Sequence, residues 1–301
     1  PPSGNIDAGG GDYVGHLVSM ATDVSPGLRV VVDCANGAMS MVAPELLSRI
    51  GVEAVVFNAS PDGTNINVAC GAAHPEALAA LVRANRCDLG IAFDGDGDRL
   101  IAAAADGTIV DGDHLIAMAA LDMKSRGALV GNSVVVTVMS NIGFHRAMES
   151  AGINVLTTPV GDRSVLVELE RSGAVLGGEQ SGHIIHRDVA TTGDGLLAAI
   201  RLLGIISRTQ RSIADLAASA MKSFPQVLLN VSVVGDAKDA LAACVDTIRE
   251  AEVQLAGSGR VLVRASGTEP VVRVMVEARD ERLAREIAER IAAAVRVSAT
   301  D

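Results

Sequence analysis

The stretch that decides the fold reads Asp88-Leu89-Gly90-Ile91-Ala92-Phe93, then Asp94-Gly95-Asp96-Gly97-Asp98-Arg99, then Leu100-Ile101-Ala102-Ala103-Ala104. The first and last parts are apolar runs of strand length, which predicts two buried strands. Between them, three carboxylates stand at every second position, and such crowded negative charge repels itself unless a cation or water neutralises it. Because core segments hold this acidic loop (residues 94–99) still, we predict a hard-cation site on a glycine-rich backbone that can turn tightly.

Two alternatives compete with this interpretation. Calcium loops of the helix-loop-helix type also begin Asp-x-Asp-x-Asp, but counted from Asp94 they need Gly sixth and Glu twelfth, where this chain has Arg99 and Ala105. A solvated acidic turn is the second alternative, and the flanking strands argue against it. Magnesium is favoured because a few carboxylates and a substrate phosphate are its usual ligands. The predicted metal ligands are Asp94, Asp96 and Asp98.

The composition is typical of an α/β protein with a large core. Aliphatic side chains dominate the 301 residues, aromatic residues make up 2% and Trp is absent. The formal net charge of −11 argues against binding to nucleic acid, so an anionic substrate would need local arginine clusters. No apolar segment has the length of a membrane span and no signal peptide is visible, so we expect no membrane partner.

Four cysteines, at positions 34, 70, 87 and 244, show no CxxC pair and no metal-ligand spacing. We therefore expect reduced thiols and a cytoplasmic protein. The sequence begins Pro1-Pro2-Ser3-Gly4 without an initiator Met, so we expect a fragment or a processed product. The sequence does not indicate the oligomeric state, and a homodimer is left open.

Strand and helix patterns alternate along most of the chain. After a loose lead-in over residues 1–12, we expect two tandem α/β domains, over 13–110 and 111–222. Their strands are expected at 28–33, 54–57, 88–93, 133–137, 154–156 and 174–176, and their helices at 14–21, 41–50, 75–85, 113–125, 144–151 and 162–171. This alternation predicts doubly wound, mainly parallel sheets that bind ligands beyond the carboxyl ends of their strands. The tandem units also suggest an internal structural repeat.

From about residue 224 the pattern changes. After a linker over 222–225, a smaller α+β domain is expected over 223–301, with strands at 227–233, 260–264 and 271–278 and helices at 237–256 and 281–295. The predicted fold class is therefore α/β, with two tandem doubly wound domains and a smaller C-terminal α+β domain.

A second polar loop, Glu179-Gln180-Ser181-Gly182-His183, follows the last expected strand of the second domain. A carboxylate, an amide, a hydroxyl and an imidazole within five residues suit the hydroxyl or amino groups of a sugar, so residues 179–183 are called the sugar loop. An ordinary polar turn is the alternative. His183 and His186 with Asp188 could also suggest zinc, but no further ligand has a telling spacing.

A third loop, Arg264-Ala265-Ser266-Gly267-Thr268-Glu269-Pro270 followed by Arg273, carries two guanidinium groups around a Ser-Gly-Thr turn. Its hydroxyls and backbone N–H groups can converge on an anion, which predicts a phosphate clamp in residues 264–273, called the arginine loop. A solvated basic turn is the alternative. Together the three loops indicate a phosphorylated sugar as ligand and phosphoryl transfer as chemistry.

In order, these loops resemble the metal-binding, sugar-binding and phosphate-binding loops of the α-D-phosphohexomutases. The resemblance covers nearly the whole chain, including residues 32–38 (VDCANGA), 61–67 (PDGTNIN), 110–113 (VDGD), 137–141 (TVMSN), 160–163 (VGDR) and 191–195 (TTGDG). Gln180 stands where the mannose- and glucose-phosphate enzymes of this family usually carry Met, and Asp162-Arg163 replaces their usual Gly-His pair. Both differences favour the branch that acts on glucosamine phosphate.

The resemblance implies that a phosphoryl group moves between O6 and O1 of the sugar. An enzyme phosphoserine donates it, a sugar bisphosphate forms and reorients, and the other phosphate returns to the serine. By the same resemblance the acidic loop would hold Mg²⁺ against the phosphoserine. Arg99 and His183 would be the catalytic side chains, with Arg99 steadying the transferring group and His183 nearby. The sugar hydroxyls would be bound by Glu179 and Ser181. The remaining phosphate would be anchored by Arg264, Ser266, Gly267, Thr268 and Arg273.

The chain departs from the family at the nucleophile. The family's phosphorylated serine lies in a Ser-His-Asn-Pro-like motif in a first domain, and no serine of this sequence has that context. We therefore expect the chain to correspond to the second, third and fourth domains, to be inactive alone and to bind Mg²⁺ weakly. The alternatives are a phosphomannomutase or phosphoglucomutase, a non-catalytic phosphosugar-binding fragment, and a magnesium phosphatase. A phosphatase usually carries a nucleophilic Asp-x-Asp at an early strand end, but Cys34 and Ala35 follow Asp33 here.

Overall fold

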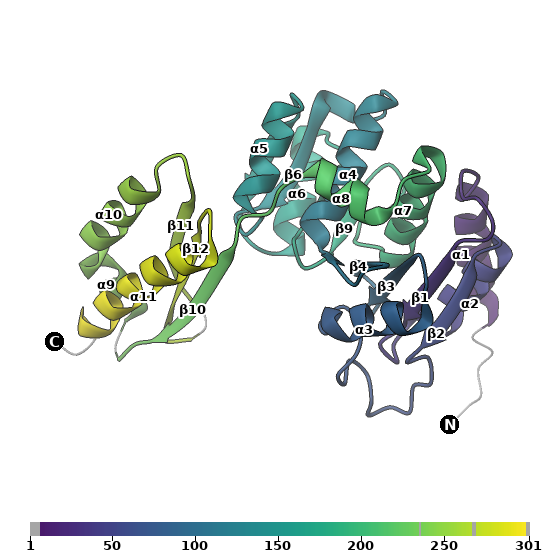
Figure 1. The fold of residues 1–301 in the computed structure, drawn as a ribbon, viewed down its shortest axis with the longest axis horizontal. Helices are drawn as coiled ribbons and strands as arrows, with labels where there is room; N and C mark the ends of the chain where they lie inside the picture. The colour runs from purple at the N-terminus through teal and green to yellow at the C-terminus, as the bar shows by residue number, and fades with distance from the viewer. Residues whose placement is uncertain (1–6, 235, 267–268, 299–301) are drawn as a thin grey trace. The chain divides into compact units, whose positions relative to one another are not determined.

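The computed structural model describes residues 7–234, 236–266 and 269–298 and divides into two compact units (Figure 1). Unit 1 comprises Pro1–Ser140 and Phe144–Met221, and unit 2 comprises Asn141–Gly143 and Lys222–Asp301. Among the described residues, no helix combines the length and the apolar character that a membrane span requires.

The first sheet of unit 1 has the strand order β2-β1-β3-β4-β5. Its strands are β1 (Arg29–Asp33), β2 (Glu53–Phe57), β3 (Leu89–Phe93), β4 (Leu100–Ala104) and β5 (Ile109–Val110). β2, β1 and β3 run parallel, whereas β4 turns back against β3 and β5 runs against β4. The acidic loop is therefore the turn of a hairpin between two wholly buried strands.

The second sheet of unit 1 repeats this topology with the order β7-β6-β8-β9. Its strands are β6 (Ser133–Thr137), β7 (Asn154–Thr158), β8 (Leu176–Gly178) and β9 (Ile184–His186). Here again three strands are parallel and the fourth turns back as a hairpin. The sugar loop joins β8 to β9, so it occupies the position that the acidic loop occupies in the first repeat. The expected internal repeat is thus present in the topology.

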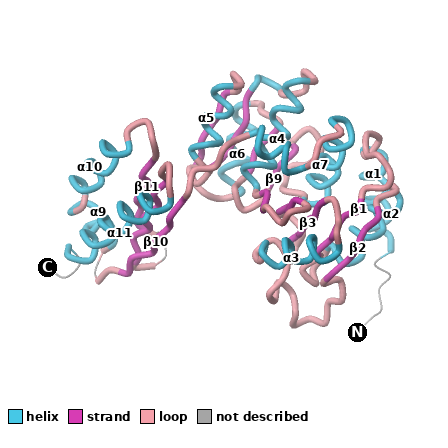
Figure 2. Tube along the Cα trace, viewed as in Figure 1, coloured by secondary structure: helices cyan, strands magenta, loops and turns pink. Residues whose placement is uncertain are grey.

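Helices cover both faces of these sheets (Figure 2). They are α1 (Asp7–Met20), α2 (Met39–Arg49), α3 (Pro75–Asn85), α4 (Gly112–Ser125), α5 (Ile142–Ser150), α6 (Asp162–Ser172), α7 (Gly195–Thr209) and α8 (Ile213–Ala220), with a 3₁₀ turn at Val130–Asn132. One continuous core joins Val32 of the first sheet, Val134 of the second and Leu203 of α7. The two predicted α/β domains therefore lie within one compact unit.

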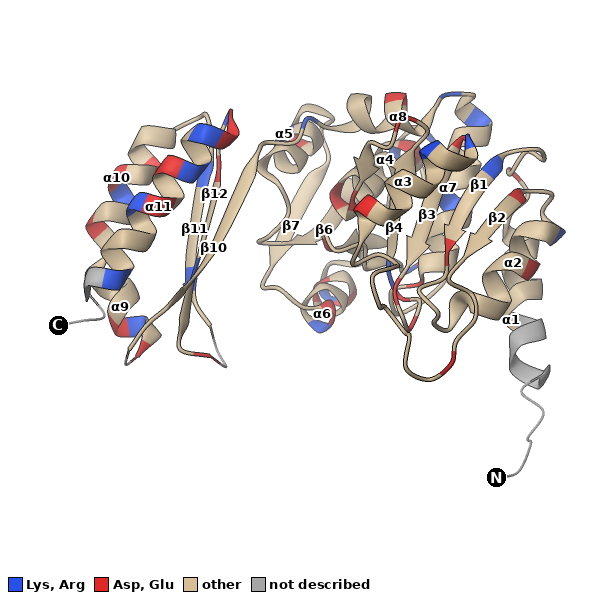
Figure 3. Cartoon of the chain, turned by 60° about the horizontal axis from the view of Figure 1, so that its bottom comes forward, with Lys and Arg blue, Asp and Glu red and all other residues tan. Residues whose placement is uncertain are grey.

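Unit 2 is a small antiparallel sheet packed on helices. The sheet has the order β10-β12-β11, with β10 (Gln226–Ser232), β11 (Arg260–Ala265) and β12 (Val271–Glu277), and the helices are α9 (Ala237–Ala243), α10 (Val245–Leu255) and α11 (Glu281–Ser298). Ile287, Ile291 and Val295 of α11 pack on Val272 and Val274 of β12 in one core. Figure 3 shows that α11 also carries acidic and basic residues, as expected for an amphipathic surface helix.

The predicted fold class is confirmed, but several elements differ. The helix expected over 237–256 is two helices, because Cys244 adopts φ −103° and ψ 6° between them and buries its side chain. Residues 7–12, expected as lead-in, belong to α1, which continues into the buried Val14 and Leu17. The strand expected at 174–176 is β8, which is shifted onto Gly177 and Gly178. A Cβ on Gly177 would lie 2.8 Å from the carbonyl oxygen of Val135, so only glycine fits.

Two helices were not anticipated. α7 is buried on most of its surface, and its two arginines, Arg201 and Arg208, stand seven residues apart on one side of the helix. α8 is short and rich in alanine. The domain boundaries at residues 110 and 222 stay predictions.

Candidate functional site

The acidic loop brings the predicted metal ligands together at the carboxyl end of β3. Oxygens of Asp94, Asp96 and Asp98 lie within 4.8 Å of one another, and in the described part of the chain no other group of three or more His, Cys, Asp or Glu has such a geometry. The backbone turns at Gly97, whose φ is +78°, and a Cβ there would lie 2.4 Å from Cε of Met39. The turn therefore requires glycine both for its dihedral angle and for its contact with α2.

The charges of this loop are only partly compensated. The Nε of Arg99 lies 3.4 Å from Asp94 Oδ2 and 3.7 Å from Asp98 Oδ1. Burial raises the pKa of Asp94 to about 6, with further contributions from Asp98 and Asp96. Oδ1 of Asp98 is buried and has no hydrogen-bond partner among the described residues. A crowded, half-buried carboxylate set with an unsatisfied oxygen fits a hard cation that takes oxygen ligands.

His183 of the sugar loop contacts a predicted metal ligand directly. Its Nδ1 lies 3.0 Å from Oδ2 of Asp98, and its Nε2 lies 3.2 Å from the backbone N of Gly193. Because an N–H of Gly193 points at Nε2, that nitrogen is the acceptor and the proton resides on Nδ1. His183 is therefore the donor to Asp98, and both ring nitrogens are already engaged.

The backbones of the two equivalent hairpin turns also pair. Arg99 and His183 form an antiparallel bridge, and the N–H of Leu100 donates to the carbonyl of Gly182 at 3.0 Å. A Cβ on Gly182 would lie 2.3 Å from the carbonyl oxygen of Leu100, so this close approach requires glycine. The acidic loop and the sugar loop of unit 1 are thus joined by hydrogen bonds of both side chains and backbone.

Some polar side chains of the sugar loop bond to neighbouring segments, and others line an open hollow. Oε1 of Glu179 accepts the N–H of Gly161 at 3.1 Å, and the Gln180 amide donates to Oδ2 of Asp111 at 3.3 Å. A hollow of about 520 Å³ is lined by Asn67, Ala72, Ala73, Pro75, Asp94, Arg99, Ile101, Gln180 and Ser181. Its volume is within the usual range for small-molecule sites.

The start of α7 also supports the acidic loop and His183, a support that the sequence did not predict. The N–H of Gly195 donates to the carbonyl of Gly97 at 2.9 Å, and Asp194 caps the helix by accepting the N–H of Leu197. Gly193, two residues earlier, is the donor to His183. The Thr-Thr-Gly-Asp-Gly stretch at 191–195 was noted only as a resemblance, and its glycines and Asp were the available signal.

The arginine loop lies in unit 2, on β11 and β12. Arg264 and Arg273 are direct partners in the antiparallel ladder, and Asn230 of β10 is the next partner of Arg273. Partners in such a ladder point to the same face, and like charges directly opposite each other are unfavourable. Within the described part of the chain, Arg273 has one ion pair, at 3.7 Å with Glu269, and its Nε is buried without a hydrogen-bond partner. This row of donors suits an oxyanion, and Asn230 was not anticipated.

The turn that completes the arginine loop is described only in part. The N–H of Ser266 donates to the carbonyl of Val271 at 2.8 Å, which closes the loop at its base. Gly267 and Thr268 lie outside the described residues.

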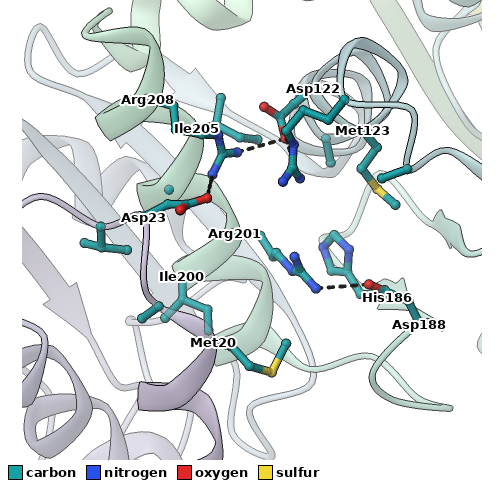
Figure 4. Close-up of a pocket in the computed structure, with 16 residues that line it drawn as sticks. Met20, Asp23, Asp122, Met123, His186, Asp188, Ile200, Arg201, Ile205 and Arg208 are labelled. Carbon is teal, nitrogen blue, oxygen red and sulfur yellow. Dashed lines mark hydrogen bonds and ion pairs between the residues drawn. The ribbon is translucent and has the colours of Figure 1, made fainter.

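The zinc alternative is wrong. His183 bonds Asp98, whereas His186 lies in a separate pocket of about 120 Å³, where Asp188 pairs with Arg201 at 3.0 Å (Figure 4). Burial lowers the pKa of His186 to about 3, with a further contribution from Arg201. The remaining charges of this pocket also form ion pairs: Arg208 pairs with Asp23 and Asp122, and Arg126 pairs with Asp122. The two histidines therefore do not share a site.

Sequence models of one family match almost all of the chain. They are described as phosphoglucomutase/phosphomannomutase alpha/beta/alpha domain II (residues 11–107), alpha/beta/alpha domain III (111–224) and C-terminal domain (228–294). The chain therefore belongs to the phosphoglucomutase/phosphomannomutase family of phosphohexomutases. Within that family, curated relatives that share about half of its residues are phosphoglucosamine mutases.

Three of these relatives show how far the similarity extends. The phosphoglucosamine mutase of Saccharopolyspora erythraea is 50% identical over 96% of this chain and 65% of its own length. That of Frankia casuarinae is 50% identical over 95% and 63%, and that of Desulforudis audaxviator is 52% identical over 93% and 63%. The chain thus spans a little under two thirds of the length of these relatives.

Solved structures show the same fold. A phosphoglucomutase/phosphomannomutase family protein from Burkholderia thailandensis superposes with a TM-score of 0.78 at 26% identity, covering 96% of this chain and 64% of that one. N-acetylphosphoglucosamine mutase of Aspergillus fumigatus, in complex with GlcNAc-6P and magnesium, gives a TM-score of 0.77 at 21% identity, covering 94% and 70%.

Proposed function

We propose that this chain provides the metal-, sugar- and phosphate-binding loops of a phosphoglucosamine mutase, which interconverts glucosamine 6-phosphate and glucosamine 1-phosphate through a bisphosphate. The observation that carries the proposal is the bonding of the acidic loop to the sugar loop through His183 and Asp98. The naming of the relatives as phosphoglucosamine mutases supports the choice of sugar.

In this proposal the acidic loop holds Mg²⁺ through Asp94, Asp96 and Asp98. The bound ion would neutralise charge that develops on a transferring phosphoryl group. Arg99 is exposed and pairs with two of these carboxylates. Once a cation takes its place beside the carboxylates, its guanidinium can turn to the phosphoryl oxygens. His183 holds Asp98 in place and is a positioning residue, since Asp98 and Gly193 already engage its two ring nitrogens.

Sugar recognition is assigned to Glu179 and Ser181. Oε1 of Glu179 is held by Gly161, whereas Oε2 makes no hydrogen bond with any described residue. A carboxylate oxygen suits the ammonium group of glucosamine better than the hydroxyl of glucose, because the bond is then charge-assisted at both ends. Ser181 lines the hollow beside Asp94 and offers a hydroxyl.

The non-reacting phosphate is assigned to the arginine loop, through Arg264, Ser266, Gly267, Thr268 and Arg273. The like charges of Arg264 and Arg273 face each other in the ladder, and a phosphate between them would remove the repulsion. Binding energy from this remote group would position the reacting end.

These residues do not supply the nucleophile. No serine of the sequence precedes His-Asn-Pro, so we propose that the 301-residue chain alone binds the sugar phosphate without converting it. The test is calorimetry with glucosamine 6-phosphate and Mg²⁺, together with an assay for glucosamine 1-phosphate. We expect saturable binding, no product and weaker binding of glucose 6-phosphate and mannose 6-phosphate.

A matched pair of variants sharpens this test. Glu179→Gln removes the carboxylate and should reduce the preference for glucosamine 6-phosphate over glucose 6-phosphate by about tenfold. Glu168→Gln changes a surface glutamate that pairs with Arg171 at 2.6 Å and should leave the preference unchanged. Absence of sugar-phosphate binding would refute the assignment, turnover by this chain would refute its inactivity, and release of inorganic phosphate would favour the phosphatase alternative.

Two further assignments accompany the proposal. We place the protein in the cytoplasm because Cys34, Cys70, Cys87 and Cys244 are all free and buried, which suits a reducing compartment. A homodimer is proposed as its assembly, and light scattering at several concentrations tests this.

A further inference from the structure

The Asp-Cys-Ala-Asn-Gly stretch that begins at the last residue of β1 has no role in the site described so far. Its first residue, Asp33, is wholly buried at the carboxyl end of β1, and the structure shows no cation paired with it in the described part of the chain. Instead, three N–H donors point at its carboxylate. Oδ1 accepts from Ala35 N at 3.0 Å and from Asn58 Nδ2 at 3.0 Å, and Oδ2 accepts from Gly71 N at 2.8 Å. Such a donor set compensates the burial of a carboxylate.

The backbone around this carboxylate is unusual. Ala35, Asn36, Asn58, Asn67 and Ala69 all have φ between +49° and +58°. L-residues disfavour this left-handed region, alanine especially, and they keep it only where the surroundings fix it. Asp33 accepts the N–H of Ala35 and the side-chain amide of Asn58. Its carboxylate is therefore central to fixing two loops, at residues 34–38 and 58–72, in this conformation.

Both loops lead directly to the acidic loop. From the first, the N–H of Ala38 donates to the carbonyl of Gly95 at 2.9 Å. From the second, the N–H of Ala72 donates to the carbonyl of Phe93 at 2.8 Å. These two carbonyls belong to the residues on either side of Asp94. The Asp33 carboxylate is thus connected, through the loops at 34–38 and 58–72, to the backbone on both sides of a predicted metal ligand.

The second repeat provides an internal comparison. Thr137 ends β6 as Asp33 ends β1, and it is equally buried. Its hydroxyl accepts one N–H, from Met139, at 3.3 Å. The first repeat, in which Asp33 accepts three N–H donors, is also the repeat that carries the acidic loop.

We propose that Asp33 is a positioning residue for the metal site: by fixing the loops at 34–38 and 58–72, its carboxylate holds the backbone of the acidic loop in the form that gathers Asp94, Asp96 and Asp98. This inference rests on the proposed magnesium site. Asp33 itself touches neither the metal ligands nor the substrate hollow, so its effect is exerted through hydrogen bonds of the backbone.

The test compares Asp33→Asn with Asp88→Asn. In Asp33→Asn an amide N–H₂ faces N–H donors where the carboxylate accepted them, so the loops lose at least one bond. Asp88 lies at the other end of the same strands and accepts the N–H of Arg29 at 2.9 Å, so its replacement makes the same chemical change far from the acidic loop. The milder variant Asn58→Gly removes one donor to Asp33 while glycine keeps the positive φ, and it serves if Asp33→Asn does not fold.

Two measurements decide the outcome. Mn²⁺ binding, followed by electron paramagnetic resonance, should weaken by about tenfold in Asp33→Asn, the scale of outer-shell effects on metal affinity, by less in Asn58→Gly and by less than about twofold in Asp88→Asn. Hydrogen exchange of the Ala38 and Ala72 amides should accelerate in the first two variants only. Unchanged exchange at both amides in Asp33→Asn and Asn58→Gly would overturn the proposal. So would equal loss of Mn²⁺ affinity in Asp33→Asn and Asp88→Asn.

Failure of the metal site is a separate result. If the unaltered chain binds no Mn²⁺ and Asp94→Asn changes nothing, the magnesium assignment fails. The exchange of the Ala38 and Ala72 amides then still decides whether Asp33 holds the acidic loop.

Discussion

His183 and Asp98 join the two repeats of unit 1 through a hydrogen bond of 3.0 Å between Nδ1 and Oδ2. Each residue lies in the turn between the third and fourth strands of its own repeat. His183 is 3% exposed, so water competes little for this bond, and Gly193 fixes the orientation of the ring from its other side. A side chain from one repeat therefore holds a predicted metal ligand of the other.

Replacing His183 with Phe should weaken Mg²⁺ and Mn²⁺ binding, because the ring is kept but the donor to Asp98 is lost. The expected change is about tenfold or more, as for other partners of metal ligands. His183→Asn, whose amide can replace the Nδ1 donor, should recover part of the affinity, and His16→Gln on the exposed face of α1 should have no effect. Titration with Mn²⁺ measures all three, and equal affinity in His183→Phe and the unaltered chain would contradict the role.

The buried His186 should make stability depend on pH. Its pKa is lowered to about 3 by burial and by Arg201, so below its usual value of about 6.5 the unfolded chain binds a proton that the folded chain does not. Stability from this residue is complete above about pH 6.5 and falls, by about 1 kcal/mol per pH unit, as the pH drops towards 4.

Denaturant unfolding between pH 4.5 and 7.5 checks this dependence. His186→Gln removes the titrating group and should flatten the curve, whereas His16→Gln should leave its slope unchanged. The same slope in His186→Gln and the unaltered chain would show that other groups cause the pH dependence.

The sequence was most informative where polar residues follow strand ends. The Asp-Gly-Asp-Gly-Asp run places three carboxylates at alternate positions of one loop, and the structure brings their oxygens within 4.8 Å of one another. Residues so close in sequence can meet through the local backbone conformation alone. The contact of His183 with Asp98 was not predicted, since it joins residues 85 positions apart and depends on how the two repeats pack. The helix α7 was missed although Asp194 caps its start and Arg201 and Arg208, seven residues apart, lie on one side of it. Asn230 was missed because its partner in the ladder depends on register.

Arg264 should have opposite effects on stability and on binding. Without an anion, Arg264→Gln relieves the repulsion with Arg273 across the ladder and should stabilise the chain by a few tenths of a kcal/mol. The same change removes a bidentate donor and should weaken glucosamine 6-phosphate binding by about tenfold or more. Arg290→Gln, on α11, is the control for charge. Denaturant unfolding and calorimetry measure the two effects, and loss of both stability and affinity would argue against a phosphate clamp.

Gly97→Ala should be more damaging than the same change at another glycine with a similar backbone. Gly97 and Gly173 have φ of +78° and +74°, but an added Cβ meets Met39 Cε at 2.4 Å in the first case and nothing within 4 Å in the second. Both variants should lose about 1–2 kcal/mol from the left-handed backbone, and Gly97→Ala should lose about 1–3 kcal/mol more from the clash. Because Met39 is the obstacle, adding Met39→Ala should cost less in the Gly97→Ala background than alone, with a coupling on the order of 1 kcal/mol. Denaturant unfolding of the four variants measures this cycle, and equal losses in Gly97→Ala and Gly173→Ala would show that the acidic loop yields freely instead of being held against α2.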